Sequence, residues 1–185
     1  MASLYLATTD GGFEEILSAE VAQQGGIVKE IRQGKVVFER GTANLSTLRK
    51  LKCAHAILAF VRFIENVPKD RAALEILEAA LLDKEAWEPA LLILQEWRPD
   101  LRGRLPTFRV TAHRRCSVRP KHQYSSIEIS GFVGSALHET MRWPVRMENF
   151  DVEVQAWLLD CTATVAISLI YSCDAKLYTR DSAGR

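Results

Sequence analysis

The chain has 185 residues, a formal net charge of +1 and a hydrophobic share of 48%. That length suffices for one large or two small domains, and the composition is that of a globular protein, which excludes a disordered or collagen-like chain. The longest apolar runs, 54–61 and 163–170, are far shorter than the ~20 residues that cross a bilayer. Because the amino terminus lacks a secretory signal, we expect an intracellular protein, cytoplasmic or nuclear, with no membrane partner.

The four cysteines are Cys53, Cys116, Cys161 and Cys173, and they are widely spaced. Without a secretory signal, this spacing favours reduced thiols over a disulfide framework. A zinc site needs clustered ligands, and His113 with Cys116 forms one lone pair at ligand spacing. We therefore expect no metal.

Strand and helix signals alternate over the first 67 residues. In chain order they are strand 3–8, helix 13–24, hairpin strands 27–31 and 35–38, helix 44–51 and strand 56–63. The assignments rest on apolar spacing and on a glycine turn at Gly34. This order is the split βαβ pattern of a ferredoxin-like domain.

A second α/β layer is predicted after a break at 67–70. Its signals are helices 71–82 and 90–97, strand 107–111, a polar loop 113–124, a helix from Ser125 to Met141, and strands 150–158 and 161–170. The pattern Ser125-x-x-Glu128 fits a capping box, in which each residue satisfies a backbone donor of the other. Trp87 and Trp97 lie at helical spacing, which favours core positions over base stacking.

Between Leu101 and Ile127 the chain has no Asp or Glu. It has seven cations there: Arg102, Arg104, Arg109, Arg114, Arg115, Arg119 and Lys121. Arginine forks and a helix amino terminus both suit phosphate groups, and His122 and Tyr124 suit stacking on an exposed base. The alternative is a solvated basic loop without a ligand. The lack of acids favours anion or nucleic-acid binding.

Three blocks in this half resemble a THUMP domain, in particular that of eukaryotic THUMP-domain tRNA guanine-N2 methyltransferases. They are Thr107-Phe-Arg-Val-Thr-Ala-His-Arg-Arg115, Ser126-x-Glu128 with Gly131, and Asn149-Phe-Asp-Val-Glu-Val154. Upstream, Gly12-Phe-Glu14, Gly34-Lys-Val-Val-Phe38 and the stretch 48–54 are similar to the domain that precedes THUMP in that family. The resemblance implies an α/β (α+β) chain, with a ferredoxin-like βαββαβ domain at 1–67 followed by a THUMP α/β domain at 68–185.

The resemblance also implies a module that grips the acceptor stem and 3′ end of tRNA for tRNA modification. By position in the motif, it assigns RNA binding to Arg109, Arg114 and the helix start at Ser125 and Ser126. The loop from Cys116 to Tyr124 departs from the family pattern, and there the charged and aromatic side chains themselves suggest RNA binding by Arg115, Arg119, Lys121, His122 and Tyr124. Arg180 lies where the family has a basic residue. In the family a methyltransferase domain that uses S-adenosylmethionine follows. This sequence contains neither its glycine-rich cofactor loop nor its Asn/Asp-Pro-Pro-aromatic motif.

We therefore expect RNA binding without catalysis or a bound cofactor in this chain. The expected partners are tRNA and a methyltransferase domain or subunit with its small activator protein. Two alternatives stay open: a fragment of a complete tRNA methyltransferase, whose parent protein is an enzyme, or a protein-interaction unit with no RNA role. A steep salt dependence of RNA binding separates the RNA reading from the last alternative.

Overall fold

The computed structural model describes residues 3–169. In chain order its elements are β1 (Leu4–Thr8), α1 (Glu14–Gln23), β2 (Ile27–Arg32), β3 (Lys35–Glu39), α2 (Leu45–Leu48), β4 (Ala56–Ile64), α3 (Ala72–Leu81), the 3₁₀ turn η1 (Lys84–Ala86), α4 (Glu88–Trp97), the 3₁₀ turn η2 (Pro99–Leu101), β5 (Phe108–Arg115), α5 (Ser126–Met141), β6 (Val152–Leu159) and β7 (Thr162–Ser168). The strands form one sheet in the order β2-β3-β1-β4-β7-β6-β5. The predicted mixed α/β fold class is confirmed.

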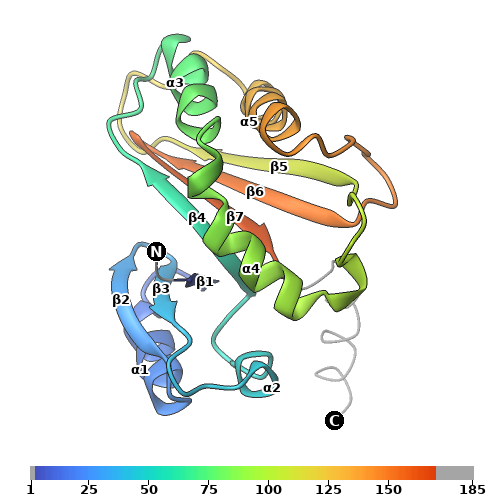
Figure 1. Ribbon diagram of the computed structural model, residues 1–185. Coiled ribbons are helices and arrows are strands. Elements are labelled where there is room, and N and C mark those ends of the chain that lie inside the picture. The colour runs from blue at the N-terminus through green and yellow to red at the C-terminus, as the bar shows by residue number, and fades with distance from the viewer. Residues whose placement is uncertain (1–2, 170–185) are drawn as a thin grey trace.

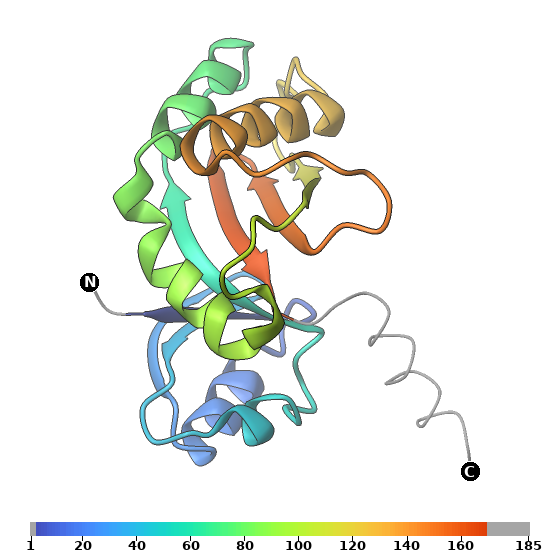
Figure 2. The same ribbon diagram turned by 45° about the vertical axis from the view of Figure 1, so that its right-hand side comes forward.

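The amino-terminal part of the sheet has the split βαβ arrangement that the sequence predicts. Strand β1 lies between β3 and β4 and is antiparallel to both, and β2 adds at the edge beside β3. Helices α1 and α2 lie with β1, β2 and β3 in the lower part of both views, whereas β4 continues into the upper part (Figures 1 and 2). Buried Leu17 and Val21 face the sheet from α1, and buried Leu48 does so from α2.

The second half adds a βαβ unit and one returning strand. Strands β5 and β6 are parallel and are connected through α5, while β7 is antiparallel to both β6 and β4. The pairing of β4 with β7 therefore carries the sheet across the boundary predicted at residue 67. The division into two domains stays a prediction, although the strands and the main core are continuous across it.

The helices cover one face of the sheet, and the main core lies beneath them. Helices α3 and α5 lie side by side over the second half (Figures 1 and 2). In β6 every second residue from Val152 to Leu158 is buried, because successive side chains in a strand point to opposite faces. Trp87 and Trp97 are both buried in this core, as predicted.

The opposite face of the sheet curls inward around a smaller apolar cluster. Its buried members are Leu6, Val37, Leu58 and Ala166, with Trp157 packed against them. A register shift between Phe60 and Arg62 in β4 marks a bulge or irregularity, the kind of feature that bends and twists a strand. The Lys35 ammonium nitrogen lies 5.7 Å from the centre of the Trp157 ring, although three strands separate β3 from β6 in the sheet.

Two local predictions need correction. Strand β5 continues to Arg115, so the residues 113–115 belong to a strand rather than to the polar loop. Parallel pairing with β6 extends as far as Arg115 opposite Leu159 and supplies the backbone partners. The helix predicted at 44–51 is a single turn, Leu45–Leu48, capped by Asn44, whose side chain accepts from the Thr47 N–H at 2.9 Å. None of the described helices has the length and hydrophobicity of a membrane span.

Candidate nucleic-acid interface

In the folded chain, carboxylates from another segment pair with arginines of the stretch 101–127, which has no acid in its own sequence. Arg104 forms an ion pair with Asp151 at 2.8 Å, and Arg109 forms one with Glu153 at 2.6 Å. Both carboxylates come from the segment that opens β6, more than forty residues further along the chain. Two of the seven cations are therefore neutralised within the fold.

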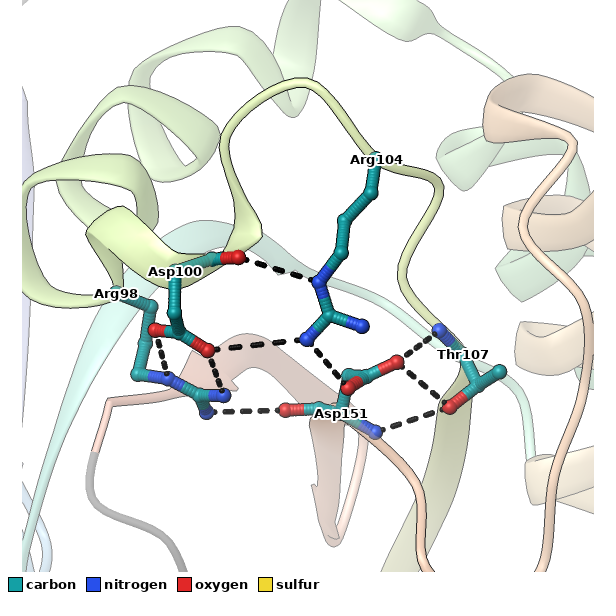
Figure 3. A network of polar contacts seen from close by, with 5 residues as sticks. All are labelled: Arg98, Asp100, Arg104, Thr107 and Asp151. Carbon is teal, nitrogen blue, oxygen red and sulfur yellow. Dashed lines mark hydrogen bonds and ion pairs between the residues drawn. The ribbon is translucent and has the colours of Figure 1, made fainter.

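Asp151 organises the entrance to β5 (Figure 3). Its carboxylate accepts from the Thr107 N–H at 2.8 Å and from the Thr107 hydroxyl at 2.9 Å, and its backbone carbonyl accepts from Arg98 at 3.1 Å. Burial, the largest single effect, raises the pKa of Asp151, but the hydrogen bonds from Thr107 and Arg104 together lower it below its ordinary value. This network fixes the loop that leads into β5 and has a structural role.

Arg109 is likewise held on the sheet. Its guanidinium lies 4.1 Å from the centre of the Phe150 ring and donates to Glu153, which also accepts from the Thr111 hydroxyl at 2.7 Å. Burial raises the pKa of Glu153, but the hydrogen bonds from Arg109 and Thr111 outweigh that effect and lower it. Arg109 was predicted to bind RNA, but here it compensates a mostly buried carboxylate.

We expect Arg109→Met to destabilise the protein by about 1–3 kcal/mol, because it leaves the Glu153 carboxylate without its charged partner. We also expect the affinity for tRNA to stay close to that of the wild type. Urea unfolding measures the first effect, and a double-mutant cycle with Glu153→Gln isolates the ion pair. A large loss of tRNA affinity without loss of stability would show that Arg109 contacts tRNA, as the sequence predicted.

Asp160 holds the basic loop 116–124 in place. It lies in the turn between β6 and β7 with a φ of 52°. Its carboxylate accepts from the Ser117 N–H at 2.7 Å and from the Ser117 hydroxyl at 2.6 Å, and its N–H donates to the Arg115 carbonyl at 2.9 Å. Hydrogen bonds from the Ser117 side chain and backbone lower the pKa of Asp160 to about 2.

Two rings of this loop, those of His122 and Tyr124, are buried. Their rings are stacked with centroids 5.3 Å apart, His122 Nε2 lies 2.6 Å from the Asp160 carbonyl oxygen, and the Tyr124 hydroxyl donates to the Pro68 carbonyl at 2.9 Å. Burial raises the pKa of Tyr124 to about 12. This burial contradicts the prediction that the two rings stack on an exposed base, because they are already packed inside the fold.

The capping box at the start of α5 is confirmed. The Ser125 hydroxyl oxygen accepts from the Glu128 N–H at 3.2 Å, and the Glu128 carboxylate accepts from the Ser125 N–H at 2.8 Å. Arg71 pairs with Glu128 at 2.6 Å. A carboxylate therefore occupies the helix end that was predicted to contact phosphate. Ser125 caps α5, and Ser126 is the first residue of that helix.

The other cations that were predicted to bind RNA differ in whether their side chains form hydrogen bonds within the fold. Arg114 donates to the His122 carbonyl at 3.1 Å and Lys121 donates to the Cys116 carbonyl, so both close the loop. Arg115 and Arg119 are exposed, and within residues 3–169 their side chains have no hydrogen-bond or ion-pair partner. Arg180 lies outside the described residues.

A pocket of about 370 Å³ opens where the two halves of the sheet meet, and we call it the seam pocket. It is lined by the β1–α1 turn, the β2–β3 turn and the last residues of β5 and β6. Lys35, His113 and Trp157 line it, and the sequence reasoning did not select them as site residues. In the sequence, Gly34 and Lys35 indicated only a hairpin turn and a part of the family resemblance, because no local pattern reveals that β3 and β6 approach each other.

No family model matches the chain. The fold is similar to THUMP and methylase amino-terminal domains. TrmN from Thermus thermophilus has 26% sequence identity and a TM-score of 0.63, over 91% of this chain and 46% of that one. A 4-thiouridine synthetase solved with RNA and ATP has 16% identity and a TM-score of 0.50 over 90% of this chain and 41% of that one, which shows the fold alone.

The sequence relationship to a curated protein is weak and partial. The chain is 36% identical over 75 residues to the mouse tRNA (guanine(6)-N(2))-methyltransferase THUMP3, over 40% of this chain and 14% of that enzyme. The chain thus spans a small part of the mouse enzyme and about half of TrmN. It is homologous to part of a tRNA-modifying enzyme.

Proposed function

We propose that this chain is a tRNA-binding module that grips the acceptor stem and 3′ end of tRNA for a tRNA-modifying methyltransferase. In this proposal a separate methyltransferase domain or subunit supplies S-adenosylmethionine and the chemistry. The relationship to the mouse tRNA methyltransferase supports the choice of substrate class. The observation that carries the proposal is that Arg115, at the end of β5, and Arg119, in the loop that follows it, are exposed and have no ion-pair partner among residues 3–169.

The position of these cations agrees with general rules of ligand binding. The carboxyl ends of parallel strands in open α/β sheets are common ligand sites, and β5 and β6 both end there. The basic loop and the start of α5 lie on the same side, because a helix that follows a strand begins near the end of that strand. RNA phosphates bound by such cations release counterions, which makes the affinity dependent on salt.

The test compares two pairs of arginines in gel shifts with tRNA at several salt concentrations. Arg115→Ala with Arg119→Ala removes two cations from the proposed interface. We expect the affinity to fall about tenfold and the log–log salt slope to decrease by roughly 1.5, as for the loss of two phosphate contacts.

The matched control is Arg102→Ala with Arg146→Ala. These arginines are also exposed but lie near the beginning of β5, roughly 25 Å away for an eight-residue strand. The control pair should keep both the affinity and the salt slope. Equal losses in the two pairs would show that binding depends on total charge and not on this surface.

A further inference from the structure

The seam pocket has walls from both halves of the fold and a size typical of small-ligand sites, which are ~300–1,000 Å³. Two walls are turns from the amino-terminal half, and two are the ends of β5 and β6. It therefore exists only in the complete sheet. The basic loop 116–124 does not contribute to its lining, so the pocket is separable from that loop by mutation.

The lining of the pocket has more positive than negative side chains, with Lys35, Arg114 and Arg115 against Asp10. Lys35 is partly buried, and within the described chain no carboxylate pairs with it. Burial, followed by the charge of Arg32, lowers the pKa of Lys35. The one acid in the lining, Asp10, lies 3.1 Å from His55 Nε2. Because taking a charge out of water is unfavourable unless it is paired, this arrangement indicates an anionic ligand.

One backbone donor in each of the two turns is already occupied by the same carboxylate. The Gly34 N–H donates to Glu14 at 2.6 Å, and the Gly12 N–H donates to the same carboxylate at 2.7 Å. The charged partners available to a bound anion are therefore side chains, and Lys35 and Arg115 are the cations of the lining for which no side-chain hydrogen bond or ion pair is found within residues 3–169.

A pair of aromatic rings lies beside these cations. His113 and Trp157 are stacked, with ring centroids 6.2 Å apart and planes 21° from parallel, and the Lys35 ammonium lies 5.7 Å from the Trp157 ring centre. His113 is exposed, so part of its side chain is accessible to a planar group. Aromatic faces beside cations are how proteins hold nucleobases together with their phosphates.

We propose that the seam pocket binds one nucleoside monophosphate unit, with its phosphate at Lys35 and Arg115 and its base against the His113–Trp157 pair. The unit comes either from a free nucleotide or from the end of an RNA chain, which present the same chemistry. The RNA source rests on the proposed function, whereas the free-nucleotide source does not.

The experiment has two assays on the same variants. The first follows tryptophan fluorescence while AMP, CMP or inorganic phosphate is added; Trp157 is partly exposed, whereas Trp87, Trp97 and Trp143 are buried. The second measures affinity for tRNA with and without its single-stranded 3′ end. The pocket variants are Lys35→Gln and His113→Ala. Arg119→Ala tests the proposed RNA interface in the loop outside the pocket, and Arg102→Ala is the control for both assays.

We expect Lys35→Gln to weaken binding of the monophosphate by about tenfold or more, as for loss of a hydrogen bond to a charged group. His113→Ala should weaken binding of the nucleotides but not of inorganic phosphate. Arg119→Ala should leave the fluorescence response to both unchanged. If free nucleotides give no response, but intact tRNA binds more tightly than trimmed tRNA and Lys35→Gln removes the difference, the unit is an RNA end.

Two results separate this proposal from the proposed function. If Lys35→Gln and His113→Ala match the wild type in both assays while Arg119→Ala weakens tRNA binding, the pocket proposal is overturned and the RNA-binding function stands. If tRNA does not bind, but AMP binds and Lys35→Gln weakens its binding, the pocket proposal stands and the RNA-binding function fails.

Discussion

Replacing Trp87 with alanine is expected to destabilise the protein by about 3–5 kcal/mol, the largest effect of any single change considered. The Trp87 side chain is fully buried, and its Nε1–H donates to the Leu81 carbonyl at 2.8 Å. The substitution removes the apolar contacts, leaves a cavity in the main core, and removes the shorter of the two hydrogen bonds that the Leu81 carbonyl accepts. Urea unfolding followed by circular dichroism measures the change.

Leu92→Ala is the matched control, because Leu92 lies on α4, four residues beyond the helix's first residue, but is 63% exposed. Exposed substitutions usually change stability by less than about 0.5 kcal/mol. If the two variants unfold at similar urea concentrations, Trp87 does not have the core role that its burial indicates.

Asp160→Asn is expected to release the basic loop and to lower the affinity for tRNA on the order of tenfold, because an interface that is ordered before binding loses less entropy. Asparagine tolerates the positive φ of 52° at this position, so the change removes the charge without straining the turn. Amide hydrogen exchange should show faster exchange at Ser117, whose N–H donates to the carboxylate.

The control for this variant is Asp83→Asn, which also removes a carboxylate that accepts a backbone N–H, at 3.1 Å, but does so in η1. It should leave the exchange of the loop and tRNA binding unchanged. Unaltered exchange at Ser117 in Asp160→Asn would mean that the loop is held by other contacts.

The dependence of the loop on pH follows from the same carboxylate. Its pKa of about 2 is below the ordinary value of ~3.9. A depressed pKa contributes stability that is present above the ordinary value and is lost as the pH falls through the folded value. The contribution of Asp160 should therefore be constant between neutral pH and about pH 4 and should disappear between about pH 4 and pH 2.

Local patterns in the sequence were enough to predict most elements of the fold. The alternation of 150–158 marks β6 because a strand buried on one face has a period of two, and Ser125-x-x-Glu128 marks the start of α5 because a capping box needs that spacing. The order of strands and helices in the first half was enough to predict the split βαβ arrangement. These features depend on residues that are close in sequence.

The site was harder to predict because its contacts join distant residues. Arg109 meets Glu153 and Arg104 meets Asp151 across more than forty residues, so a count of charges along the chain overstated the free positive charge. His122 and Tyr124 are buried although their loop is polar, because the β6–β7 turn and the Pro68 carbonyl provide partners that the loop sequence does not show. Lys35 and Trp157 meet only after the sheet curls.

Because β4 pairs with β7, one edge of β4 stays unpaired until the ribosome has made β7. Strand β4 ends at Ile64, and β7 begins at Thr162. A ribosome that adds ~5–20 residues per second needs roughly 5–20 s to make the intervening ~100 residues. During that interval the nascent chain presents an unpaired strand edge beside the apolar rings of Phe60 and Phe63, which is the kind of surface that chaperones bind and that invites aggregation.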